Sequence, residues 1–165
     1  MRISFEVDGV QQTIRAFQQV ERGVVDLREL GTWDWVQSEY YKVLKEHLDS
    51  EGSAGQSGRW KALTPKYAAV KRATYGDKPI LQATGEMYTS LTTSGGGAVV
   101  EKSAQEMTLG SSNPKASWHN RGAGRLPRGK IIDFTDEQKK RIVAPIEKKM
   151  RQLVDNAKLR DIRGF

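Results

Sequence analysis

Hydrophobic residues recur at helical spacing in two long stretches of the chain, residues 32–49 and 135–157. In both stretches the apolar positions share one face and charged side chains occupy the other, which is typical of amphipathic helices. In the first stretch this face consists of Trp33, Val36, Tyr40, Val43, Leu44, His47 and Leu48. In the second it consists of Ile142, Ile146, Met150, Leu153 and Ala157. The pattern therefore predicts two long helices that pack through apolar faces.

The second of these helices should begin at a capping box and contain a proline. Thr135 and Gln138 stand at the spacing at which the threonine caps the helix and the glutamine reaches back. An interior proline such as Pro145 costs a helix about 3 kcal/mol, so we expect a kink or two abutting helices there. Few apolar residues follow Lys158, and residues 158–165 are expected to be a frayed tail.

Alternation of apolar and polar positions predicts short strands. Residues 2–7 alternate strictly and should form a half-buried strand. Residues 99–102 and 106–110 are expected to pair as a hairpin around a turn at 103–105. The apolar residues 131–134 predict a further strand.

Shorter helices are predicted from capping signals. Asp8-Gly9-Val10-Gln11 is a capping box before a helix that should end near residue 22. Thr84 should cap a helix over residues 85–91.

A further short helix is predicted over residues 66–73. Thr64 is a good N-cap, and the proline after it suits the first helical position. In this helix Tyr67 and Val70 are expected to point inward, and Lys66, Lys71 and Arg72 outward.

Two glycine-rich segments without periodicity, residues 50–58 and 111–130, predict long loops. Trp60 and Leu63 are interpreted as anchors that pin the end of the first loop to the core. Together these patterns favour one α+β domain over residues 1–157, in which a small, mostly antiparallel sheet is packed by amphipathic helices.

The chain is poor in apolar residues for a self-contained domain of its length. Only 37% of its 165 residues are hydrophobic, and the mean hydropathy is −0.64. Parts of such a chain stay loose in the monomer or become ordered against a partner. Residues 1–55 carry 6 basic and 10 acidic side chains, a net charge of −4, and residues 56–165 carry 21 and 10, a net charge of +11. This polarity suits nucleic acid, docking between neighbouring subunits, or an ordinary solvated surface.

The residues needed for common catalytic and metal sites are scarce. The chain has no cysteine and two histidines, His47 and His119. It has neither a P-loop nor a Gly-x-Ser-x-Gly motif, and His47, at the edge of an apolar stripe, is interpreted as structural. We therefore expect no catalytic residue, no metal and no cofactor. No apolar stretch approaches the ~18–20 residues that span a bilayer, and the first ten residues lack the features of a signal peptide.

A basic segment is the candidate contact site. Within residues 111–130 five basic residues occur without an acid. They are Lys115, Arg121, Arg125, Arg128 and Lys130. Glycine-spaced basic residues suit phosphate contacts, but Trp118 is the single aromatic residue that could stack on bases. The segment is predicted to contact either an acidic partner surface or nucleic acid.

An ordered series of short motifs covers about residues 27–155. The motifs are Ser50-Glu51-Gly52, Gly58-Arg59-Trp60-Lys61-Ala62-Leu63-Thr64, Tyr67-Ala68 with Lys71, Pro79-Ile80-Leu81, Thr84-Gly85-Glu86-Met87, Ser90-Leu91, Gly110-Ser111, Trp118-His119-Asn120-Arg121-Gly122 and Pro127-Arg128. In this order they resemble the virion morphogenesis or tail completion family of tailed bacteriophages, which includes Mu-type morphogenesis and P2-type tail completion proteins. In this chain Arg128 is followed by a glycine and a lysine before the apolar residues, which departs from the family's pattern.

This resemblance implies a structural protein of the phage virion that acts in tail completion and head–tail joining. It implies no catalysis and no cofactor. The expected partners are other phage tail or neck proteins, with a homo-oligomeric ring in the virion, possible proximity to DNA and no membrane. The expected location is the tail or the head–tail interface of a virion assembled in the bacterial cytoplasm. The alternative is a basic nucleic-acid-binding protein that uses residues 115–130.

Overall fold

The computed structural model describes residues 2–5, 26–122 and 130–163. Within these residues the chain has an α+β fold with five helices and three strands. In chain order they are β1 (Arg2–Phe5), α2 (Thr32–Asp49), α3 (Pro65–Tyr75), α4 (Glu86–Thr92), β2 (Ala98–Lys102), β3 (Met107–Ser111), α5 (Pro114–Arg121) and α6 (Asp136–Arg163). The predicted fold class is confirmed. The helix expected over residues 10–22 lies outside the described residues.

The three strands form an antiparallel sheet in the order β1-β3-β2. β2 and β3 are the predicted hairpin, and Ser103 closes its turn by donating its N–H to the carbonyl of Glu106 at 2.8 Å. β1 adds to the other edge of β3, with Phe5 opposite Met107. The N-terminal strand therefore pairs with a segment far along the sequence.

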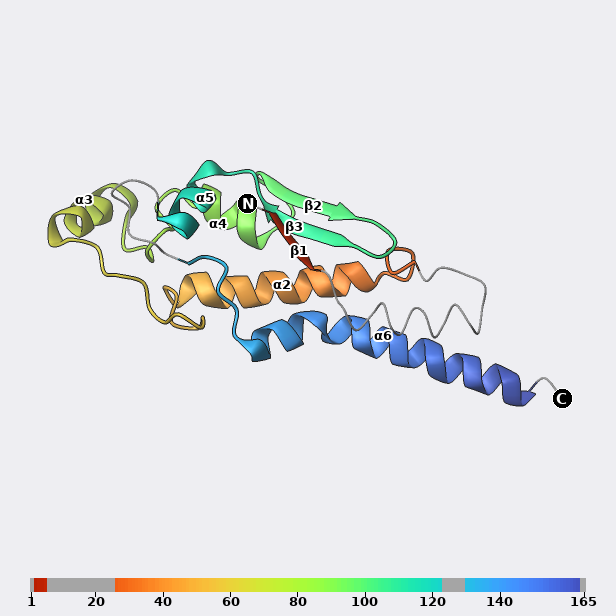
Figure 1. Ribbon diagram of the computed structural model, residues 1–165. Coiled ribbons are helices and arrows are strands. Elements are labelled where there is room, and N and C mark those ends of the chain that lie inside the picture. The colour runs from red at the N-terminus through yellow and green to blue at the C-terminus, as the bar shows by residue number, and fades with distance from the viewer. Residues whose placement is uncertain (1, 6–25, 123–129, 164–165) are drawn as a thin grey trace.

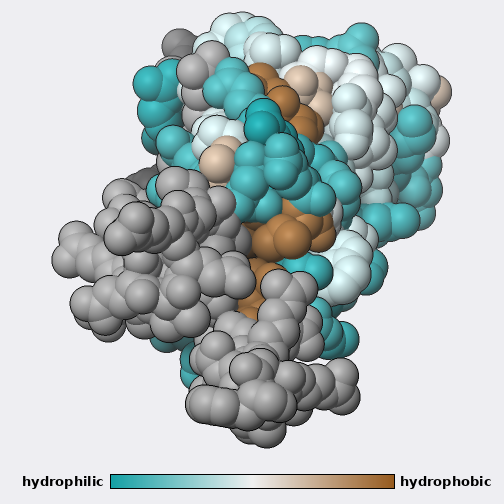
Figure 2. Space-filling model, turned by 90° about the vertical axis from the view of Figure 1, so that its right-hand side faces the viewer, coloured by the Kyte–Doolittle hydropathy of each residue, from teal (hydrophilic) through white to brown (hydrophobic). Residues whose placement is uncertain are grey.

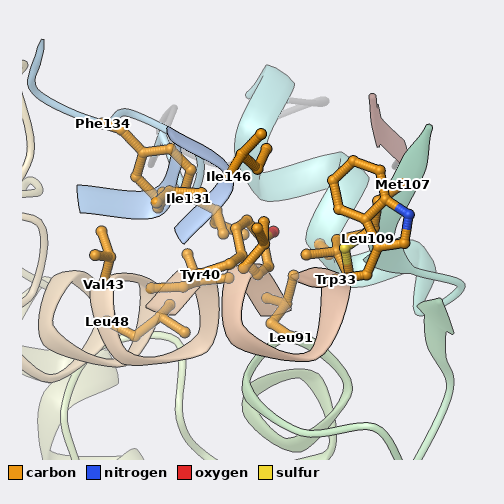
Figure 3. Packing of buried hydrophobic residues seen from close by; sticks show 14 of the residues in the cluster. Trp33, Tyr40, Val43, Leu48, Leu91, Met107, Leu109, Ile131, Phe134 and Ile146 are labelled. Carbon is orange, nitrogen blue, oxygen red and sulfur yellow. The ribbon is translucent and has the colours of Figure 1, made fainter. Parts of the chain in front are cut away.

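Helices α2 and α6 run antiparallel and side by side, and α2 lies between α6 and the sheet (Figure 1). The predicted apolar face of α2 is buried in full. Ile142 and Ile146 of α6 are buried as well, and Arg141 on the exposed side pairs with Glu46 of α2 at 3.1 Å. Figure 3 shows side chains from α2, α4, β3, α6 and residues 131–134 meeting in one core.

The two ends of α6 test the sequence interpretation. The capping box is confirmed: Thr135 Oγ1 accepts the N–H of Gln138 at 3.2 Å, and Gln138 Oε1 accepts the N–H of Thr135 at 2.9 Å. The helix runs through Pro145 without a break, so the expectation of two abutting helices is wrong. Burial of the isoleucines on either side of the proline offsets the lost hydrogen bond. The helix also continues beyond Lys158, to Arg163.

Two predictions for residues 111–134 are wrong. Residues 114–121 form α5, because Asn113 caps this helix by accepting the N–H of Lys115 at 3.0 Å and Pro114 occupies its first turn. Residues 131–134 form no strand. Ile131 is buried as expected, but its N–H donates to Asn120 Oδ1 at 3.0 Å instead of to a strand.

Two predictions for the short helices are also wrong. Thr84 does not cap α4, because Gly85 in a left-handed conformation precedes the helix and no side chain caps it. In α3 the predicted cap is confirmed, with Thr64 Oγ1 accepting the N–H of Tyr67 at 3.4 Å. The predicted orientation of α3 is confirmed for Lys66 and Arg72, which are exposed. It is wrong for the other three residues: Tyr67 and Val70 are exposed and Lys71 is buried.

Candidate functional site

The end of α2, the loop at residues 50–60 and residues 130–138 meet in a buried contact that we call the loop junction. His47 is completely buried, and its Nε2 lies 2.8 Å from the carbonyl oxygen of Lys130. A carbonyl can only accept, so Nε2 carries the proton. The indole N–H of Trp60 donates to the same oxygen at 3.3 Å, and the two rings meet edge to face with centroids 5.4 Å apart. One main-chain carbonyl thus fixes both rings.

Two glycines let the loop backbone pass against these rings. A Cβ at Gly55 would lie 2.3 Å from His47 Cε1 and 2.8 Å from the carbonyl oxygen of Asp133. A Cβ at Gly52 would lie 2.6 Å from the ring of Trp60. Both separations are shorter than non-bonded atoms tolerate, so the loop requires glycine at these positions for close approach.

Asp133 ties the other side of the loop. Its carbonyl accepts the N–H of Gln56 at 3.0 Å, and its carboxylate accepts the N–H and the hydroxyl of Ser57. Burial alone would raise the pKa of Asp133, but the hydrogen bonds from Ser57 and the charge of Lys130 outweigh it and hold this pKa below its ordinary value. Lys130 lies 3.7 Å from the carboxylate and also donates to Ser57 Oγ at 2.7 Å.

The predicted anchors differ in burial. Trp60 is buried, and its main-chain N–H donates to the carbonyl oxygen of Glu51 at 2.8 Å, which closes the loop. Leu63 is half-buried. The loop is therefore closed by contacts within the single chain, chiefly through Trp60.

Beyond the loop, residues 61–78 leave the body of the molecule and return; we call them the α3 arm. α3 lies apart from the sheet and from the α2–α6 pair (Figure 1). Lys71 fixes the segment through which the arm returns to the body, because its Nζ donates to the carbonyl oxygens of Lys78 and, at 3.0 Å, Pro79. Glu51 holds the next residue, accepting the N–H of Ile80 at 2.9 Å.

The arm is anchored by polar groups and exposes apolar ones. Hydrogen bonds from Arg59 and from the Ile80 N–H lower the pKa of Glu51. Tyr67 is 53% and Val70 55% exposed, and Tyr75 is 41% exposed. Sequence reasoning missed the burial of Lys71, because its partners are main-chain carbonyls that hydropathy does not register.

The structure places the described members of the basic segment in separate surroundings. Lys115 and Arg121 lie at opposite ends of α5. Lys115 pairs with Glu86 at 3.3 Å, and Arg121 donates to Ser117 Oγ at 2.6 Å. Lys130 belongs to the loop junction. Arg125 and Arg128 lie outside the described residues.

Between Lys115 and Arg121, α5 exposes nearly half of Trp118. Each of these three residues is three positions from the next, so they lie on adjacent turns of the helix surface. Burial lowers the pKa of His119 below its ordinary value, so at neutral pH its imidazole adds no charge. The positive charge of α5 comes from its lysine and arginine.

No protein-family model matches the chain, and neither the curated proteins nor the solved structures gave a significant match. None of the helices in the described part of the chain is both long enough and apolar enough to cross a membrane.

Proposed function

We propose that this chain is a structural protein of a tailed bacteriophage virion, acting in tail completion and head–tail joining through protein–protein assembly. The observation that carries the proposal is the α3 arm. It exposes Tyr67, Val70 and Tyr75 on a helix that stands apart from the core. Exposed apolar side chains gathered on one element are characteristic of a surface that another protein covers.

The positions of the motif residues support the proposal. Gly52 and Trp60 close the loop junction, and the main-chain N–H of Ile80 donates to the carboxylate of Glu51. The hydroxyls of Ser90 in α4 and Ser111 in β3 form a buried pair at 2.7 Å. Trp60 and Ile80 flank the arm in sequence, and the two serines join α4 to the sheet. This arrangement is consistent with the assembly role that the resemblance implies.

The test is removal of the gene from a phage or prophage that carries it, followed by electron microscopy of the lysate. Unjoined heads and tails, or tails of abnormal length, are expected. Complementation by the wild-type gene should restore infectious particles, and the double variant Tyr67→Ser, Val70→Ser should not. Trp118→Ser, which also removes an exposed aromatic side chain, is the matched control and should complement. Normal particles from the deletion would overturn the assembly role.

One observation favours the alternative, a nucleic-acid-binding protein. Trp118 lies exposed between Lys115 and Arg121 on α5, an arrangement that offers a stacking surface between two phosphate contacts. Binding to single-stranded DNA should then weaken steeply as salt rises, with a slope that falls by roughly 0.7 for each lost phosphate contact. The double variant Lys115→Glu, Arg121→Glu tests this alternative. Absence of single-strand binding at physiological salt would exclude it.

A further inference from the structure

Two distant surfaces of the molecule differ in charge. The α3 arm, residues 61–78, contains five basic residues and one acidic residue, a net charge of +4. Far from it lie residues 26–35 and the β2–β3 turn, residues 101–106, which together we call the acidic end (Figure 1). The acidic end contains five acidic and two basic residues, a net charge of −3. The α3 arm and the acidic end therefore carry opposite charges.

Hydrogen bonds hold the acidic end as one surface. The indole N–H of Trp33 donates to the carbonyl oxygen of Ser103 at 2.7 Å, and the N–H of Leu27 donates to that of Ala104 at 2.8 Å. Lys102 pairs with Asp34 across the two segments at 2.6 Å. The start of α2 and the hairpin turn are thus fixed relative to each other.

The acidic end also offers an exposed apolar group. Trp35 is 50% exposed at the start of α2, close in sequence to the exposed Glu29. Figure 2 views the molecule from this side, and its surface is mostly hydrophilic with a narrow hydrophobic strip. An aromatic anchor among acidic residues is complementary to tyrosines among lysines.

The two surfaces cannot meet within one chain, because the α3 arm and the acidic end lie far apart in the molecule (Figure 1). We infer that the α3 arm of one copy docks on the acidic end of the next copy. The exposed Lys61 and Lys66 would face the acidic residues, and Tyr67 and Val70 would meet Trp35. This inference rests on the proposed assembly function and names the contact that carries it.

Such a contact joins different surfaces of the two copies. It is heterologous, so repetition gives a ring where the rotation closes and a filament where it does not. Nucleic acid fits the arm less well, because phosphates would pair with its lysines and leave Val70 uncovered, and because the acidic end would repel them. A second copy satisfies both ends at once.

The first experiment is sedimentation velocity of the purified full chain over a range of protein and salt concentrations. Species larger than the monomer should appear at low salt and shrink as salt rises, because exposed charges are screened. The double variant Tyr67→Ser, Val70→Ser should weaken self-association at least about tenfold. Trp118→Ser and Lys148→Glu, both at exposed positions outside the two surfaces, should leave it unchanged.

The second experiment distinguishes a heterologous contact from a symmetric one. An arm variant, Lys61→Glu with Lys66→Glu, and an end variant, Glu29→Lys, should each associate at least about tenfold more weakly than wild type, because each places like charges opposite each other. In a mixture, the intact arm of the end variant meets the intact acidic end of the arm variant, and the reversed arm meets the reversed end. Both contacts pair opposite charges, so the mixture should recover the association that each variant alone has lost. A symmetric contact between two arms or between two acidic ends would not recover in this way.

Three outcomes would overturn the inference. They are a wild-type chain that stays monomeric at low salt, self-association that survives both charge variants, and an arm whose substitutions abolish duplex DNA binding without changing oligomeric state. A monomeric chain whose gene deletion still gives unjoined heads and tails would leave the assembly function standing with another partner. Self-association together with normal particles from the deletion would retain the contact and refute the function.

Discussion

The loop junction and the α3 arm are consecutive in the chain but differ in which side chains they bury. The junction buries aromatic rings, whereas the arm buries a lysine and exposes apolar side chains. In the loop junction the rings of His47 and Trp60 share one carbonyl, and the glycines bring the backbone against them. In the arm Lys71 is buried against carbonyls, and Tyr67 and Val70 face solvent. The junction is closed by contacts within one chain, whereas the arm presents apolar side chains to solvent. Stability is therefore assigned to the junction, and the proposed assembly contact to the arm.

The largest contrast is expected between the core beneath the junction and the arm. Leu44→Ala removes a completely buried side chain and should lower the free energy of unfolding by about 2–5 kcal/mol. Val70→Ala on the exposed face of α3 should change it by less than about 0.5 kcal/mol. Urea denaturation of both variants measures the difference. A comparable loss from Val70→Ala would mean that the arm is packed within the chain.

The next effect concerns close approach in the loop junction. Gly55→Ala forces a Cβ into His47 and into the Asp133 carbonyl, and should cost about 1–3 kcal/mol. Gly95→Ala is the matched control, because its Cβ would meet nothing closer than Thr93 Oγ1 at 3.9 Å. Thermal unfolding should separate the two variants. Equal stabilities would show that the loop does not lie against the histidine.

A third substitution tests how the arm is attached. Lys71→Met leaves the carbonyls of Lys78 and Pro79 without their hydrogen-bond donor. Because an unsatisfied buried acceptor costs about 1–3 kcal/mol, the free energy that holds the arm in place should fall by that amount. The loss should be local, so hydrogen exchange should accelerate in α3 far more than in α2. Lys66→Met, on the exposed side of α3, controls for loss of charge. Faster exchange throughout α2 would contradict a separately held arm.

The smallest effect is a pH dependence of the junction. Because the pKa of Asp133 is held below its ordinary value of 3.8, its carboxylate stabilises the fold above that pH and loses the effect as pH falls through the lower folded-state pKa. Asp133→Asn should cost about 1 kcal/mol at pH 7 and progressively less below pH 4. Asp77→Asn, whose side chain is 90% exposed, should show no such trend. Denaturation curves at several pH values supply the measurement.

The sequence predicts best where periodicity or local chemistry decides the structure. The buried face of α2 follows from its spacing, and Thr135 and Gln138 form their capping box because both partners lie within one helical turn. The prediction fails where a distant group decides. The N–H of Ile131 is satisfied by the side chain of Asn120, so an apolar run that favours a strand forms none.

The same limit applies to the candidate site. Trp60 is buried at the predicted anchor position, because a large apolar ring gains free energy when it leaves water. The orientation of α3 is not predictable from its hydrophobic pattern. The main-chain carbonyls of Lys78 and Pro79 accept hydrogen bonds from Lys71 and hold it inward, so Tyr67 faces outward. In the sequence, Lys130 is one of five similar basic residues. Only the fold shows that it lies in the loop junction, whereas Lys115 and Arg121 lie on the surface.

The position of β3 at the centre of the sheet has a consequence for the order of folding. Its pairing with β2 closes a short turn, but its pairing with β1 joins Phe5 to Met107 and closes most of the chain between them. Contacts between residues near in sequence form quickly, and contacts that close a long loop of the chain form slowly. The hairpin is therefore expected to form first, and the edge strand β1 and the covering helix α6 to dock later. During synthesis the apolar face of α2 stays uncovered until α6 has been made and docks on it. In this interval the exposed apolar surface makes the nascent chain prone to aggregation.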